Sequence, residues 1–103
     1  MTDDGSGQFD SEWVACDADA LCWAEWSDGC TVYHRPSGAT HLLNPSSVWL
    51  LRRLSSGPLS VRAAASELAE QEGAELSTEL CADIERVLFR FGHLGLVRCV
   101  KKP

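Results

Sequence analysis

Residues 32–45 read VYHRPSGATHLLNP, and this stretch decides the architecture of the chain. Two β-prone runs, residues 30–34 and 39–43, flank the four residues Arg-Pro-Ser-Gly. The proline favours the first central position of a type I turn, and the glycine accepts the positive φ that closes it. Asn44-Pro45 is typical of a helix start, because asparagine caps free N–H groups and proline suits the first helical position. The stretch therefore predicts a β-hairpin that leads directly into a helix.

The flanking residues extend this hairpin into a larger α+β pattern. Residues 20–26 predict a first strand, which a short Ser-Asp-Gly connection joins to the hairpin. Apolar residues at helical spacing, with caps before them and glycines after them, predict helices over residues 45–54, 61–72 and 78–94. Residues 96–100 add a short terminal strand. We therefore expect a winged-helix-like α+β domain in which a three-stranded antiparallel sheet precedes three helices.

The composition limits the class of protein. A chain of 103 residues with 45% hydrophobic side chains and four tryptophans predicts one folded domain. No apolar run approaches the ~20 residues of a membrane span, and the first residues lack the features of a secretory signal. The five cysteines are odd in number and form no CxxC motif, which favours reduced thiols. We therefore expect a cytoplasmic protein without a membrane partner.

The negative charge is concentrated at the N-terminus. Six carboxylates and no basic residue lie among the first twenty residues, whereas the remaining chain carries nine acidic and nine basic side chains. Glycine and serine are also frequent there, so residues 1–19 predict a flexible acidic arm that aids solubility. Phe9 and Trp13, near its end, are the residues able to pack onto the domain, which we expect to span residues 20–100.

Four short motifs occur in an order that resembles a known family. They are Val32-Tyr33-His34, Ser37-Gly38, Leu43-Asn44 and, near the C-terminus, Leu94-Gly95-Leu96-Val97. Their order and spacing resemble those of the PqqD-like peptide chaperones, which are the recognition elements for ribosomally made precursor peptides. The Tyr-His pair and the tryptophans near the first strand are similar to the subgroup found beside an HPr-kinase-related protein. The likeness covers roughly residues 20–100.

This resemblance implies a non-catalytic peptide-binding module. In that family the leader of the precursor peptide adds as an antiparallel strand to the third strand, against the third helix, and is presented to a modifying enzyme. For this chain the resemblance implies a leader peptide and a modifying enzyme, such as an HPr-kinase-related protein, as partners. The implied peptide-binding residues are Ala39, Thr40, His41, Leu42, Leu43, Cys81, Ile84, Glu85 and Leu88.

The residues themselves support an available edge on the third strand. Residues 39–43 contain no proline, no lysine and no fixed charge, so the usual protection of an edge strand is absent. Such an edge is covered, used for a ligand, or paired with a second copy, which leaves a homodimer open. Cys81, Glu85 and Leu88 lie on one flank of the third helix, whereas Asp83 and Arg90 lie on the other. The sequence does not decide which flank faces the strand.

Two other classes of function are consistent with parts of the sequence. The alternative is a winged-helix DNA-binding regulator that uses Arg86, Arg90 and Arg98, but acidic residues lie among them and the globule is neutral. A four-residue turn would also place Cys30, His34 and His41 on one face of the sheet, one ligand short of a closed zinc site. No catalytic motif is present. We therefore expect no nucleic acid, no metal or other cofactor, and no enzymatic activity.

Overall fold

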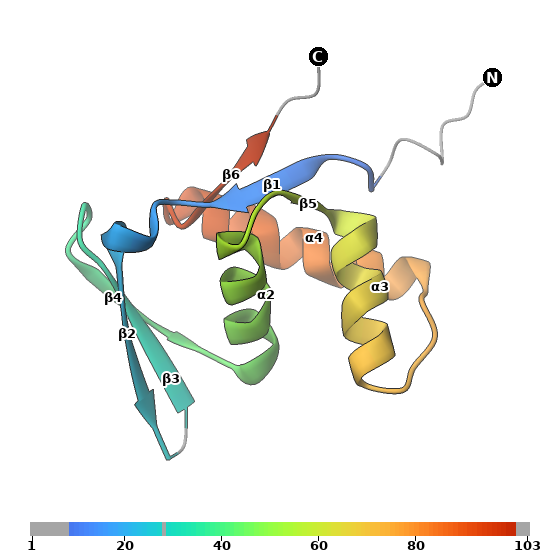
Figure 1. Cartoon of the computed structure of the whole chain (residues 1–103), viewed down its shortest axis with the longest axis horizontal. Coiled ribbons are helices and arrows are strands. Elements are labelled where there is room, and N and C mark those ends of the chain that lie inside the picture. The colour runs from blue at the N-terminus through green and yellow to red at the C-terminus, as the bar shows by residue number, and fades with distance from the viewer. Residues whose placement is uncertain (1–8, 28, 101–103) are drawn as a thin grey trace.

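The computed structural model describes residues 9–27 and 29–100 and shows a small α+β domain (Figure 1). These residues form two three-stranded antiparallel sheets and three α-helices. One sheet has the strand order β2-β3-β4 and the other has the order β5-β1-β6. The α+β class predicted from the sequence is confirmed, but the strands do not all precede the helices. None of the helices in the described part of the chain is long and apolar enough to cross a membrane.

The first sheet follows the hairpins seen in the sequence. Its strands are β2 (Leu21–Trp26), β3 (Gly29–His34) and β4 (Ala39–Leu43). The turn between β3 and β4 closes where the Gly38 N–H donates to the His34 carbonyl oxygen at 2.8 Å. Gly38 has a φ of 74°, a conformation that glycine adopts without a steric penalty. The meander therefore forms nearly as the turn residues predict.

The second sheet collects three distant segments. Strand β1 (Glu12–Ala15) lies in the middle, between β5 (Leu59–Ser60) and β6 (Val97–Val100). The composition predicts a flexible arm over residues 1–19, whereas in the structure residues 12–15 form a strand of this sheet and a short 3-10 helix, η1 (Ala18–Ala20), follows. Phe9 and Trp13 are buried, and their apolar surface accounts for the difference. Residues 1–8 of the expected arm lie outside the described residues.

The three helices begin at the residues that the sequence indicates. Helix α2 spans Pro45–Ser55, α3 spans Val61–Gln71, and α4 spans Thr78–His93. The side chains of Asn44, Ser60 and Ser77 each accept a hydrogen bond from a backbone N–H of the first turn, at 2.8, 3.0 and 3.1 Å. Each cap satisfies an N–H group that has no partner within its own helix.

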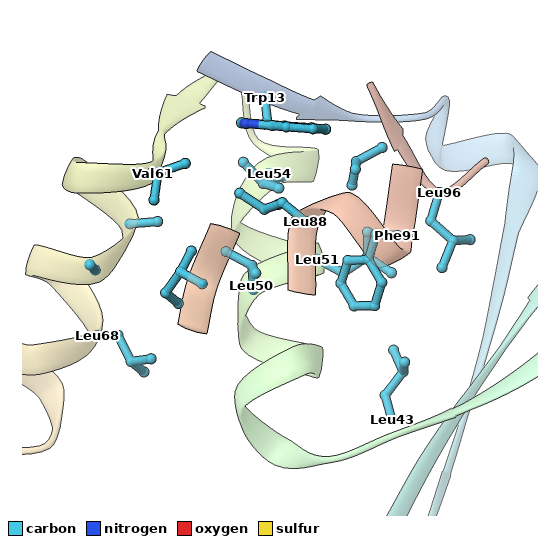
Figure 2. Packing of buried hydrophobic residues seen from close by; sticks show 14 of the residues in the cluster. Trp13, Leu43, Leu50, Leu51, Leu54, Val61, Leu68, Leu88, Phe91 and Leu96 are labelled. Carbon is cyan, nitrogen blue, oxygen red and sulfur yellow. The ribbon is translucent and has the colours of Figure 1, made fainter. Parts of the chain in front are cut away.

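Helix α2 is at the centre of the hydrophobic core. Figure 1 shows it between the β2–β3–β4 sheet and α3. Leu51 and Leu54 are completely buried, and Leu50 is almost so. Figure 2 shows Trp13 reaching from β1 onto the same cluster, near Leu54 and Leu88. The second sheet therefore covers the core, while the first sheet flanks it, and in the described residues no further strand pairs with its outer strands β2 and β4.

Candidate functional site

The open edge of the β2–β3–β4 sheet belongs to β4, and its free backbone groups follow from the register. Trp26 pairs with Gly29 across the first hairpin. At the other end of the same register, the Arg35 N–H donates to the Ala20 carbonyl oxygen at 2.8 Å. Hydrogen-bonded pairs alternate along an antiparallel ladder, so the backbone of His34, one residue before Arg35, is directed toward β4 instead. The β3 residues at even positions therefore bond to β4.

The same alternation identifies the outward groups of β4. His34 pairs with Ala39, and the following pairs place His41 opposite Val32. The backbone groups of residues 39, 41 and 43 are thus directed toward β3. Those of Thr40 and Leu42 point away from the sheet. In the described part of the chain no strand pairs with this edge, so these N–H and C=O groups remain available to an added strand.

A groove of about 920 Å³ runs along this edge. Residues 40–43 of β4 form one wall, the start of α2 closes one end, and the last turns of α4 form the opposite wall. The α4 wall consists of Val87, Arg90, Phe91 and Leu94. Backbone donors and acceptors on one side and a helix face on the other make a site for an extended chain.

The groove is apolar at its base and carries one charge. Leu43 and Phe91 are buried and belong to the hydrophobic core, while Val87 and Leu94 are half-buried. Figure 2 shows the Phe91 ring above Leu43 in this view, and both belong to the same hydrophobic cluster. Arg90 is exposed and is the one charged side chain among the described residues that line the groove. The site thus offers apolar contacts together with a single cation.

The structure places four of the five predicted β4 residues in this groove. Thr40, His41, Leu42 and Leu43 line it, whereas Ala39 lies outside it and pairs with His34. Thr40 and Leu42 share the outer face of the sheet, where Leu42 is 76% exposed. The strand part of the predicted site is therefore brought together around one edge.

The four predicted α4 residues lie elsewhere. Cys81, Ile84 and Leu88 are buried in the core, and Glu85 is half-buried; none of them lines the groove. The groove wall comes instead from the helix flank that carries Arg90, together with Val87, Phe91 and Leu94. The rotation of α4 is set by its packing, since one side lies against α3 and its end leads into β6. The periodicity of the sequence predicts which residues of α4 are buried, but it does not predict which flank of the helix faces β4.

The histidines on the inner face differ in their hydrogen bonding. His34 is buried, and its Nδ1 lies 2.8 Å from the Ser37 Oγ. His41 lines the groove, and its buried Nε2 has no hydrogen-bond partner among the described residues. The register does place Cys30, His34 and His41 on one face, as the four-residue turn predicts. Among residues 9–27 and 29–100, however, no three potential ligands gather closely enough to hold a metal ion.

Other reactive or basic groups lie outside the groove. Burial and the carboxylate of Asp17 raise the pKa of the Cys16 thiol, which keeps this cysteine protonated at neutral pH. Arg86, one of the arginines that a DNA-binding reading would use, is paired with Asp83 at 3.0 Å. Neither Cys16 nor Arg86 lines the groove beside β4, which we take as the candidate site because it combines an unpaired strand edge with a helix face.

No protein-family model matches the chain, and no curated protein or solved structure matches it either. The function is therefore argued from the groove and the open edge themselves.

Proposed function

We propose that this domain binds an extended peptide, the leader of a ribosomally made precursor, by antiparallel addition of a strand to β4. The bound leader is then presented to a modifying enzyme in the cytoplasm, and an HPr-kinase-related protein is the candidate that the sequence resemblance suggests. The observation that carries the proposal is the free backbone edge at Thr40 and Leu42 beside a groove of about 920 Å³. Main-chain hydrogen bonds supply the affinity in this binding mode, and side-chain pockets supply the specificity.

The groove has walls that suit an extended chain. Its volume lies near the upper end of the usual range for ligand sites, about 300–1,000 Å³. One wall presents backbone groups at strand spacing, and the other presents Val87, Phe91 and Leu94. An added strand would lie roughly 4.8 Å from β4, where its alternate side chains face α4. The open edge and the apolar wall would then act on the same ligand.

The opposite edge of the same sheet supports the assignment to β4. There, Arg52 of α2 lies with its guanidinium 4.2 Å from the centre of the Trp23 ring. The same guanidinium pairs with Glu25 at 3.0 Å. Strand β2 thus carries a charged residue, Glu25, and charged residues disfavour the addition of another strand to an edge. Strand β4 has no fixed charge along its length.

Proline substitutions at adjacent positions test the proposal. The probe is a set of peptides selected on the wild-type domain from a display library of random twelve-residue sequences. Thr40→Pro removes an outward N–H that the sheet does not use, so we expect a native circular dichroism spectrum and at least a tenfold loss of peptide affinity. His41→Pro removes an N–H directed toward β3 and should destabilise the fold itself. Peptides that bind Thr40→Pro as tightly as the wild type would place the ligand elsewhere.

Amide hydrogen exchange gives a second measurement of the same edge. In the free domain the amides of Thr40 and Leu42 should exchange rapidly, while the amide of His41 is protected by the ladder. A bound selected peptide should protect Thr40 and Leu42 and leave His41 unchanged. Protection that appears without peptide, and that grows with protein concentration, would mean that a second copy occupies the edge.

A further inference from the structure

Arg90 forms no ion pair with any carboxylate of the described residues. Four other arginines form ion pairs: Arg52 with Glu25, Arg53 with Glu67, Arg62 with Asp10, and Arg86 with Asp83. In residues 9–27 and 29–100 no carboxylate forms such a pair with Arg90, although its side chain is exposed on the groove wall. An arginine guanidinium is well suited to bind a carboxylate through two parallel hydrogen bonds.

The sequence of α4 explains why Arg90 has no partner on its own helix. Ion pairs on a helix form between residues three or four positions apart. At those distances from Arg90 stand Arg86, Val87, His93 and Leu94, none of which is acidic. The nearest acidic residues along the helix are Glu85, five positions away, and Asp83, which is already paired with Arg86. A carboxylate for Arg90 must therefore come from another part of the chain or from a ligand.

The geometry of strand addition brings ligand side chains to this wall. Thr40 and Leu42 would form the hydrogen-bonded pairs with an antiparallel strand, and His41 would face a ligand residue between them. That residue, and those two positions before and after it, point to the inner face of the sheet, as Ala39, His41 and Leu43 do. The inner face is the one toward α4. Every second residue of the ligand thus meets a wall of three apolar side chains and Arg90.

We propose that the bound peptide carries an aspartate or glutamate at one inward position, where it pairs with Arg90. Its apolar side chains then stand two or four residues from that carboxylate and contact Val87, Phe91 and Leu94. This inference rests on the proposed function and specifies the chemistry of its ligand. The chain has a net charge of −6, which disfavours generally acidic peptides, so the acid is selected by position rather than by total charge.

The library selection is repeated on four variants to test this assignment. Arg90→Gln removes the cation, Arg90→Glu reverses it, and Thr40→Pro reports on strand addition. Arg86→Gln is the matched control, since it removes one positive charge from the same helix without changing the groove lining. Wild type and Arg86→Gln should enrich an acidic residue at one fixed position, with large apolar residues at even distances from it. Arg90→Gln should lose only the acid, and Arg90→Glu should replace it with lysine or arginine.

Affinities of one selected peptide make the result quantitative. Changing its acid to the corresponding amide should weaken binding to the wild type by about tenfold, and to Arg90→Gln by less than about twofold. If Arg90→Gln still selects the same acid, the inference is wrong, while loss of binding by Thr40→Pro would leave the proposed function standing. The proposed function and this inference both fail in either of two cases. In the first, the selection on wild type enriches no peptides that the selection on Thr40→Pro does not also enrich. In the second, Thr40→Pro binds the selected peptides as tightly as wild type does.

Discussion

The two sheets of this domain are built from the chain in opposite ways. The β2–β3–β4 sheet uses one continuous stretch and two hairpins, whereas β5, β1 and β6 come from the middle and both ends of the described chain. The local sheet leaves Trp26, Tyr33 and Leu42 exposed on its outer face and keeps the edge of β4 free. The long-range sheet places Trp13 and Val97 in the core. One sheet thus contributes side chains to the core, while the other leaves the edge of β4 without a strand partner in the described part of the chain.

The edges of the two sheets also differ. At the outer sides of β1 stand β5, which has two residues, and β6, which has four and carries Arg98. Short or charged edges resist the addition of another strand. Strand β4 is five residues long and has no fixed charge. The comparison therefore predicts that changes in the long-range sheet act on stability, while changes at the β4 edge act on binding.

The largest effect on stability is expected at Trp13. This side chain is 7% exposed, and its ring meets that of Phe89 edge to face, with the centroids 5.6 Å apart. It also packs near Gly92 of α4. Trp13→Ala should lower the free energy of unfolding by about 3–5 kcal/mol, because the cavity it leaves lies between β1 and the core. Urea unfolding followed by circular dichroism measures this loss.

Trp26 provides the matched control in the other sheet. It is 62% exposed, and its indole N–H donates to the Thr31 hydroxyl oxygen at 3.2 Å on the outer face. Trp26→Ala should therefore change stability by less than about 1 kcal/mol. Equal losses for the two tryptophan variants would remove the distinction between a sheet that closes the core and a sheet that flanks it.

An intermediate effect is expected at Gly95, where the two sheets approach each other. Gly95 precedes β6 with a φ of 81°, and a Cβ placed there would lie 3.2 Å from the His34 Cε1 of β3. Gly95→Ala should thus combine backbone strain with crowding and cost up to about 3 kcal/mol. Gly73 has a φ of 68° but open space around it, so Gly73→Ala should cost only the backbone part, about 1–2 kcal/mol. Equal shifts in the melting temperature of the two variants would show that crowding against His34 does not contribute to the loss of stability.

The sequence predicts the local sheet well and the long-range sheet poorly. Short sequence motifs predict the strands of the meander and the three helix caps. Examples are the Arg-Pro-Ser-Gly turn and Asn44 before Pro45. Strand β1 has only four residues and follows an acidic segment, and its partners lie far away along the chain. The burial of β1 depends on contacts with segments far away along the chain, which a local sequence pattern does not predict. The terminal strand was expected, but its pairing with β1 was not.

The candidate site likewise has one part that the sequence predicts and one part that it does not. The uncharged edge of β4 is visible in the sequence, since residues 39–43 lack proline and charge. The flank of α4 that faces the groove is not visible, because tertiary packing sets the rotation of the helix. The sequence does show that no acidic residue stands three or four positions from Arg90 on its helix. A charge without a partner on its own helix is thus a feature that the sequence shows, whereas its place beside β4 depends on tertiary packing.

The smallest effect is expected at the ion pair between Arg53 and Glu67. This pair links α2, which follows the local sheet, to α3, which follows β5. Two hydrogen bonds connect the guanidinium and the carboxylate, at 2.8 and 3.1 Å. The hydrogen bond from Arg53 lowers the pKa of Glu67. Both side chains are about one-third exposed, so solvent screens the pair. Glu67→Gln should therefore cost less than about 1 kcal/mol at neutral pH.

The pH dependence of that cost identifies its origin. Because the folded state lowers the pKa of Glu67 below the ordinary value of 4.5, the pair stabilises the fold above that pH. The contribution is lost as the pH falls through the lowered pKa of the folded state. Urea unfolding of wild type and Glu67→Gln should differ at pH 7, and the difference should shrink as the pH falls below 4.5. Glu70→Gln, at an exposed position on the same helix, is the matched control. If Glu67→Gln lowered the free energy of unfolding by the same amount in acid as at pH 7, the loss would come from packing between α2 and α3 and not from the ion pair.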